Sequence, residues 1–196
     1  MIWTATFVIA VCLFKSCETK ASVRVVKPNK ARVIYGKGHG KDVALWVARS
    51  CVGEAGFDSG ESGECAAIAH IYRKRTKVTQ FNLYQVTRRY SAAIKKGPHQ
   101  KRKWVFYLCR DLKKPKYWSK GLHWPNYRDK WASILKLCDD FIAGKVLDPI
   151  PHADHYGGRM DRHRAKKWNW YKLDTPDFKN HFWSVTCPKR KEKNDA

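Results

Sequence analysis

The chain has 196 residues and a formal net charge of +23, from 40 Lys and Arg against 17 Asp and Glu. Its 43% hydrophobic content, with nine Trp, is enough for one packed domain and excludes a disordered chain. The charge predicts a polyanionic partner, such as nucleic acid, teichoic acid, lipopolysaccharide or the carboxylate-bearing cell wall, held by an attraction that salt weakens. The alternative is a basic surface that only aids solubility.

Residues 1–14 form an apolar stretch that ends at Lys15. Its length fits the core of a signal peptide better than a membrane span. We therefore predict that residues 1–22 are a signal peptide or a short membrane anchor, with a buried terminal strand as the alternative. The protein is then expected to be exported, to the periplasm, the cell wall or the medium, or to belong to a phage virion. Membrane contact is expected only through this segment, and residues 23–41 are predicted to be a basic linker.

The next segment predicts an amphipathic helix over residues 42–53 that carries a carboxylate on its apolar face. At about 100° per residue, Val47, Ser50 and Glu54 fall on one stripe, and Gly53 marks the end of the helix. A carboxyl group there is partly desolvated and lies at the negative end of the helix dipole, and both effects favour its protonated form. Glu54 therefore suits a general acid. The alternative is a Glu paired with a basic neighbour on a solvated helix end.

The downstream pattern predicts further helices. Asp58 and Glu61 fit a capping box for a second helix that extends to about Lys77. Glu64 is expected on the solvated face of that helix. Apolar residues at helical spacing then predict a third helix over residues 84–94.

A short helix is expected inside the basic stretch 95–120, and a clear apolar stripe predicts another over residues 131–142 that ends at Gly144. The C-terminal part is rich in Pro, Gly and aromatic residues, which favours one or two small β-hairpins. Residues 188–196 are predicted to be a charged, disordered tail. The expected fold class is α+β, mainly α, in one domain over residues 42–187.

Five cysteines remain once residues 1–22 are set aside, so they cannot all pair. Cys51 and Cys65 could form a disulfide across the loop over residues 56–63. The alternative is that each cysteine is a small buried hydrophobe. The chain has no Cys-x-x-Cys motif, which disfavours a cysteine zinc ribbon.

A second segment, residues 148–158, is dense in turn formers and ring side chains. Several short motifs along the chain resemble, in their order over residues 42–183, those of the SleB-type cell wall hydrolases. They are Gly53-Glu54-Ala55, the helix over residues 64–75, Ala143-Gly144 leading to Asp148-Pro149, Ala153-x-His155-Tyr156, and Asn180-His181-Phe182-Trp183.

The resemblance implies a compact lysozyme-like fold that cuts the glycan strand of peptidoglycan at muramic acid, by hydrolysis or by lytic transglycosylation. It implies that Glu54 is the catalytic acid and that His155 and Tyr156 position or shape the substrate site. With Tyr90 and Ser91, they form the predicted substrate-binding set. No metal ion and no cofactor is expected.

The chain departs from the family pattern at residues 150–153, where members usually carry Thr-Gly-Gly-Ala or a similar run, and in the basic stretch 95–120. These differences affect the expected substrate preference more than the assignment of Glu54 as the catalytic acid. No second carboxylate is assured, so the sequence leaves open whether water or the muramyl hydroxyl attacks.

The sequence also allows two other functions. His152, Asp154, His155 and His163 could bind zinc or serve a nuclease, although neither His-Glu-x-x-His nor a nuclease motif is present. The main alternative is a basic, non-catalytic binding protein for an anionic polymer, either the cell wall or nucleic acid, with nucleic acid less favoured.

The aromatic residues can be assigned in two ways. Those interleaved with Lys and Arg over residues 104–127 could stack on sugar rings or bases, and some of them must pack the core. Those over residues 168–171 could form a wall opposite Glu54.

Overall fold

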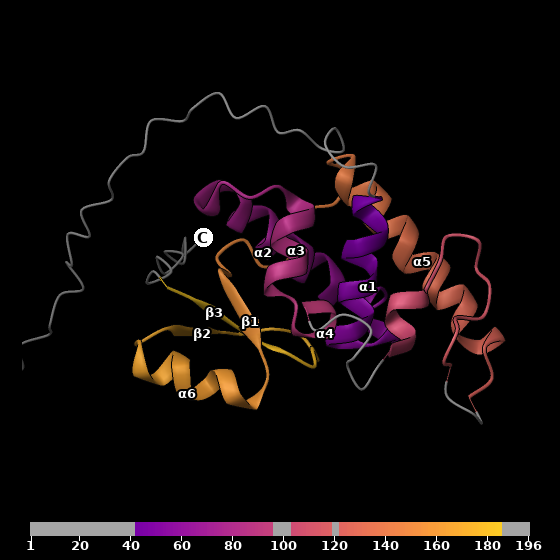
Figure 1. Cartoon of the computed structure of the whole chain (residues 1–196). Helices are drawn as coiled ribbons and strands as arrows, with labels where there is room; N and C mark the ends of the chain where they lie inside the picture. Colours follow the sequence, from indigo (N-terminus) through magenta and orange to yellow (C-terminus); the bar gives the residue numbers. More distant parts are fainter. Residues whose placement is uncertain (1–41, 96–102, 119–121, 186–196) are drawn as a thin grey trace, which may run out of the picture. The chain divides into compact units, whose positions relative to one another are not determined.

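The structure is a computed structural model that describes residues 42–95, 103–118 and 122–185 (Figure 1). They all belong to one compact unit. The predicted signal peptide or anchor, the basic linker and the charged tail lie outside the described residues. Within the described part, no helix combines the length and the apolar character that a membrane crossing needs.

The described chain is mainly helical and ends in a small sheet, which confirms the predicted fold class. The α-helices are α1 (Val43–Ala55), α2 (Glu64–Thr79), α3 (Leu83–Tyr90), α4 (Ala92–Lys95), α5 (Pro125–Ile142) and α6 (Arg159–Lys167). Two 3-10 helices are η1 (Phe57–Ser59) and η3 (Lys103–Tyr107). The strands β1 (His155–Gly157), β2 (Tyr171–Leu173) and β3 (His181–Ser184) form an antiparallel sheet in the order β1-β3-β2. The lysozyme-like fold itself stays a prediction.

Helix α1 contacts α2, α3, α4 and α5, so it lies at the centre of the helical part (Figure 1). Asp42 caps it, since its side chain accepts a hydrogen bond from the backbone N–H of Leu45 at 3.0 Å. Val47 and Ser50 are fully buried and Glu54 is partly buried, as the stripe on this helix predicted. The face of α1 that builds the core therefore also carries Glu54 to the edge of the core.

The predicted apolar stripe after residue 130 is confirmed in α5. Its buried residues are Trp131, Ile134, Leu135, Cys138 and Phe141. They belong to the main hydrophobic core. Soon after the helix the chain passes through Gly144 at φ 79°, a left-handed conformation that glycine adopts without strain.

The predicted start of the second helix is wrong. Helix α2 begins at Glu64 after Gly63, which has φ 79°, and no side chain caps it. Asp58 instead lies in η1, where its carboxylate pairs with Lys130 over 2.6 Å. The chain makes an extra 3-10 turn before α2, which takes Asp58 away from the N-cap position.

The helix predicted over residues 84–94 is interrupted. Ser91 has extended backbone angles, with φ −78° and ψ 116°, and separates α3 from α4. This break lets the Ser91 side chain and the first turn of α4 meet α1. Helix α6 was missed because its sequence is almost wholly polar, with Ala165 as its buried residue among those described.

One lysine of α2 makes several contacts with the segment that leads into β1. The ammonium group of Lys74 donates to the carbonyl oxygens of Pro151 at 2.7 Å and Ala153 at 2.8 Å, and it pairs with Asp148 at 2.8 Å. Strand β1 then pairs with β3. Both attachments fix Tyr156, in the middle of β1, beside α2.

Candidate active site

Glu54 lies in the last turn of α1, and its hydrogen bonds converge on one carboxylate oxygen. The hydroxyl of Ser91 donates to Oε1 over 2.7 Å, and the backbone N–H of Ala93 donates to the same atom over 2.9 Å. No described residue donates a hydrogen bond to Oε2. When the carboxyl group is protonated, two donors on Oε1 leave Oε2 as the atom that holds the proton. The carboxyl group is thereby oriented as a proton donor through Oε2.

Gly53 permits this arrangement because it has no side chain. A Cβ atom at position 53 would overlap the Cβ of Ala93. Helix α4 can therefore approach α1 closely enough for the Ala93 N–H to reach Glu54 only with glycine at position 53.

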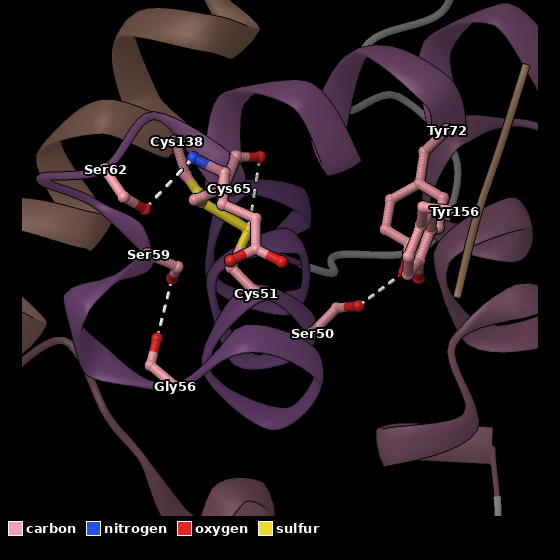
Figure 2. Close-up of a disulfide and its surroundings, with 10 residues drawn as sticks. Ser50, Cys51, Gly56, Ser59, Ser62, Cys65, Tyr72, Cys138 and Tyr156 are labelled. Carbon is pink, nitrogen blue, oxygen red and sulfur yellow. Dashed lines mark hydrogen bonds between the residues drawn. A yellow bond between two sulfur atoms is a disulfide. The ribbon is translucent and has the colours of Figure 1, made fainter. Parts of the chain in front are cut away.

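Three hydroxyl groups from different elements meet beside Glu54. Ser50 Oγ of α1 lies 2.6 Å from the hydroxyl of Tyr72 in α2, and that hydroxyl lies 2.5 Å from the hydroxyl of Tyr156 in β1. Figure 2 shows Ser50 and Tyr156 both directed toward the end of the Tyr72 ring. The Tyr72 hydroxyl also interacts with the side chain of Ser91, the residue that bonds Glu54. We call the carboxylate of Glu54 and the four hydroxyl side chains around it the hydroxyl cluster, which consists of Ser50, Glu54, Tyr72, Ser91 and Tyr156.

The charge of Glu54 acts on both phenols of this cluster. Burial raises the pKa of Tyr72 to about 12, and the negative charge of Glu54 is the next largest cause. Burial also raises the pKa of Tyr156 well above its ordinary value, and the neighbouring Tyr72 and Glu54 add to the effect. Both phenols therefore keep their protons near neutral pH and offer neutral hydroxyl groups to the site.

Two of the four predicted substrate-binding residues, Ser91 and Tyr156, belong to the hydroxyl cluster. The other two lie near it. Tyr90 is exposed, and its ring lies under the guanidinium group of Arg75, 4.5 Å from the ring centroid. His155 precedes Tyr156 in β1 and packs on another ring.

Arg75 is a cation close to this site. After burial, its charge is the next largest cause that lowers the pKa of His155, and it also acts on Tyr156. Among the described residues, no carboxylate pairs with its guanidinium. Arg75 therefore offers a positive charge to an anionic group of a ligand.

The ring of His155 lies against that of Trp170, with centroids 4.0 Å apart. Its Nδ1 atom is buried and has no hydrogen-bond partner among the described residues. Trp168 extends the aromatic group, because its ring lies 5.1 Å from that of Trp170 and is 56% exposed. The residues predicted as an aromatic wall thus adjoin the strand that carries Tyr156.

Sequence reasoning gave no role to Tyr72 or Arg75. They lie three residues apart in α2, so they share one face of that helix. Their spacing of three residues in a predicted helix is the signal in the sequence that places them on one face. That this face of α2 lies toward Glu54 depends on how α1 and α2 pack, which the periodicity of one helix does not show.

The carboxylates that follow Glu54 in the chain serve other purposes. Asp58 pairs with Lys130, and Glu61 is exposed. The prediction that Glu64 is solvated is wrong, since it is 1% exposed. None of the three is a described partner of the Glu54 carboxylate.

Glu64 is buried because it holds the segment before β3. Its carboxylate accepts hydrogen bonds from the backbone N–H of Lys179 at 3.0 Å and of Asn180 at 2.9 Å, and from the Asn180 side chain at 2.8 Å. The same Asn180 amide donates to the backbone carbonyl of Glu54 at 3.4 Å. Glu64 therefore holds Asn180, and Asn180 in turn contacts the end of α1.

The alternative zinc set of His152, Asp154, His155 and His163 does not form a metal-binding group among the described residues. Asp154 accepts hydrogen bonds from the Ser184 side chain and the Val185 backbone instead. In the described part of the chain, the group of three metal-capable side chains that do meet is Cys51, Cys65 and Cys138. The first two of these cysteines are joined to each other.

The disulfide Cys51–Cys65 was one of two alternatives, and the structure contains it. It ties α1 to α2 across the loop that includes η1 (Figure 2). Cys138 lies beside it as a free, buried thiol with its Sγ 3.8 Å from that of Cys65.

The aromatic residues over residues 104–127 are mostly packing residues. Rings in contact with one another and with Phe57 are Trp104, Trp118, Trp124 and Tyr127. Tyr117 is 53% exposed.

Comparisons with protein-family models, curated proteins and solved structures found no match for this chain. The SleB-type resemblance therefore stays a prediction from the order of short motifs.

Proposed function

We propose that the protein cleaves the glycan strand of peptidoglycan, with Glu54 as its general acid and base. The observation that supports this most is the one-sided bonding of the Glu54 carboxylate. Ser91 and Ala93 hold Oε1, while Oε2 receives no hydrogen bond from the described residues. A carboxyl group that is fixed through one oxygen and receives no described hydrogen bond at the other suits proton transfer to and from a bound sugar.

In the first step, protonated Glu54 donates its proton to the glycosidic oxygen as the bond to muramyl C1 breaks through an oxocarbenium-like state. The two hydrogen bonds on Oε1 stabilise the carboxylate that forms. In the second step this carboxylate takes the proton of the attacking hydroxyl group. Because Asp58 and Glu64 are engaged elsewhere, we propose that the muramyl hydroxyl attacks and leaves anhydromuramyl ends.

The groups around Glu54 suit the rest of such a substrate. The neutral phenols of Tyr72 and Tyr156 place uncharged hydroxyls near the carboxylate, so they do not compete with it for the proton. The exposed Trp168 ring offers a face to a sugar, and Arg75 offers a charge to the acidic groups that peptidoglycan carries.

The test is mass spectrometry of the soluble fragments that purified peptidoglycan releases. Wild type is compared with Glu54→Gln, which keeps the shape of the side chain and removes the titratable group, and with Glu61→Gln, which alters an exposed carboxylate on the following loop. We expect anhydromuramyl fragments from wild type and Glu61→Gln but not from Glu54→Gln. Reducing ends would mean that water attacks. Absence of fragments from all three proteins would refute cleavage and favour a basic, non-catalytic binding protein.

A further inference from the structure

Helix α3 carries a groove that has no part in the proposed chemistry. It is a shallow, open depression with a volume of about 410 Å³, lined by Phe81, Tyr84, Gln85, Arg88 and Arg89. These residues recur at spacings of three and four, so they form one face of the helix and its entry. Ser91, at the far end of α3, faces Glu54 instead.

Both arginines of the groove rest on aromatic rings. The guanidinium of Arg89 lies 5.0 Å from the centroid of Phe81, and that of Arg88 lies 4.7 Å from the centroid of Trp46 and 5.6 Å from that of Phe106. A guanidinium that stacks on a ring keeps its N–H edges free for a planar, bidentate acceptor. The rings restrain the two cations and leave their donors available.

No carboxylate in the described part of the chain neutralises Arg88 or Arg89. Arg110 shows the contrast, because it pairs with both Asp42 and Asp139. The groove lining contains no acidic residue at all. Its electrostatic complement is therefore a ligand with more than one negative charge.

A third guanidinium group lies near the Trp46 ring. Arg49 lies 4.8 Å from the centroid of Trp46, and its Nη2 donates to the carbonyl of Leu108 at 2.7 Å. Trp46 thus has two cations near its ring. Arg49 is held by the fold, whereas Arg88 and Arg89 line the groove.

We propose that this groove binds a polyol phosphodiester polymer, a chain of the poly(glycerol phosphate) type. Such a polymer places one negative charge in every repeat, so two successive phosphates can meet the two guanidinium forks. Its polyol hydroxyls can bond the Gln85 amide. A single-stranded nucleic acid would instead require several free aromatic faces for its bases. Phe81 in the groove and the neighbouring Trp46 lie under the protein's own guanidinium groups, and Tyr84, which meets Trp46 edge to face, is the one remaining described ring of the lining. This site is independent of the proposed cleavage by Glu54.

The proposal is tested with the full chain, by titrating a fluorescent poly(glycerol phosphate) oligomer at constant salt. The groove variant is Arg88→Gln with Arg89→Gln. The matched control is Lys166→Gln with Lys167→Gln, which removes two exposed charges from α6. We expect about a tenfold or greater loss of affinity for the groove variant and less than about a twofold loss for the control, because only the former removes bidentate contacts. An equal loss in both variants would show a general charge effect and overturn the proposal.

Four further measurements complete the test. A single-stranded DNA oligomer of equal charge should bind more weakly, and tighter binding that depends on the same arginines would overturn the choice of polymer. Arg88→Lys with Arg89→Lys should recover only part of the affinity, since lysine lacks the fork, and full recovery would refute the bidentate contact. Glu54→Gln should bind the oligomer as wild type does, which separates this site from the proposed enzyme. Circular dichroism of each variant establishes that any loss occurs in a folded protein.

Discussion

The hydroxyl of Ser91 donates a hydrogen bond to Oε1 of Glu54 over 2.7 Å, across the break between α3 and α4. Ser91→Ala removes one of the two donors that orient the carboxylate. A hydrogen bond to a charged group contributes about 1.5 to 3 kcal/mol, so we expect the rate of fragment release to fall by about tenfold or more. The rate is measured on purified peptidoglycan at saturating substrate. Ser59→Ala, which removes a hydroxyl group of η1 that donates to the Gly56 carbonyl, should leave the rate unchanged.

A second prediction concerns the close approach of α1 and α4. Gly53→Ala places a Cβ against that of Ala93, so α4 must move and its N–H must leave Glu54. We expect a loss of cleavage with a smaller loss of stability. The double variant Gly53→Ala with Ala93→Gly moves the methyl group from one helix to the other, and it should recover part of the activity. Failure of the second change to rescue any activity would show that the steric contact is not the cause.

Arg75 is expected to act on substrate binding rather than on the chemical step. Arg75→Gln removes the cation that lies over Tyr90 and acts on His155 and Tyr156. We expect KM for peptidoglycan fragments to rise by about three- to tenfold with little change in kcat. The lost ion pair would stabilise the bound substrate and the transition state equally. Lys77→Gln, which removes an exposed charge two residues further along α2, is the control. A fall in kcat at constant KM would assign Arg75 to the chemistry instead.

The position of Glu54 could be predicted because it depends on one helix. Val47, Ser50 and Glu54 repeat at helical spacing, and the structure has them on the inward side of α1. The strong apolar stripe of α5 was predictable for the same reason. Local periodicity is enough where a single element decides the outcome.

The rest of the site depends on contacts between distant segments. Tyr72 and Tyr156 meet because Lys74 holds the loop before β1 on α2 and because β1 pairs with β3. The Lys74 contact joins residues about eighty positions apart. Glu64 seemed a surface residue by its charge, but the three N–H donors that satisfy it come from the segment before β3. A carboxylate can be buried when the fold supplies such donors, and the periodicity of one helix does not reveal donors from another segment.

The disulfide Cys51–Cys65 is expected to stabilise the arrangement of α1 and α2. Its sequence separation is 14 residues, and closing a loop of about this size contributes roughly 3 kcal/mol in the chain-entropy account. Cys51→Ala with Cys65→Ala should lower the free energy of unfolding by about that amount, as measured by urea denaturation. Cys109→Ser changes an exposed free thiol and is the control. Equal urea midpoints for the double variant and the control would contradict the prediction.

The buried phenol of Tyr72 makes stability depend on alkaline pH. Burial raises its pKa from 10.0 to about 12 in the folded protein. Between these values the unfolded chain loses the phenolic proton while the folded chain keeps it, so the free energy of unfolding falls as pH rises. At about pH 11 this group alone should cost roughly 1.4 kcal/mol relative to pH 9. Tyr156 and Cys138, whose pKa values burial also raises, act in the same direction, so the comparison must be made between variants.

Tyr72→Phe removes that titration without removing the ring. The urea midpoint should therefore fall less between pH 9 and pH 11 in Tyr72→Phe than in wild type. The variant is expected to be less stable at both pH values, because Ser50 and Tyr156 lose a hydrogen-bond partner. Tyr117→Phe, on a ring that is 53% exposed, should retain the wild-type dependence. Equal pH dependence in Tyr72→Phe and wild type would mean that the Tyr72 hydroxyl is accessible to solvent. It would then be free to bind substrate rather than fixed between Ser50 and Tyr156.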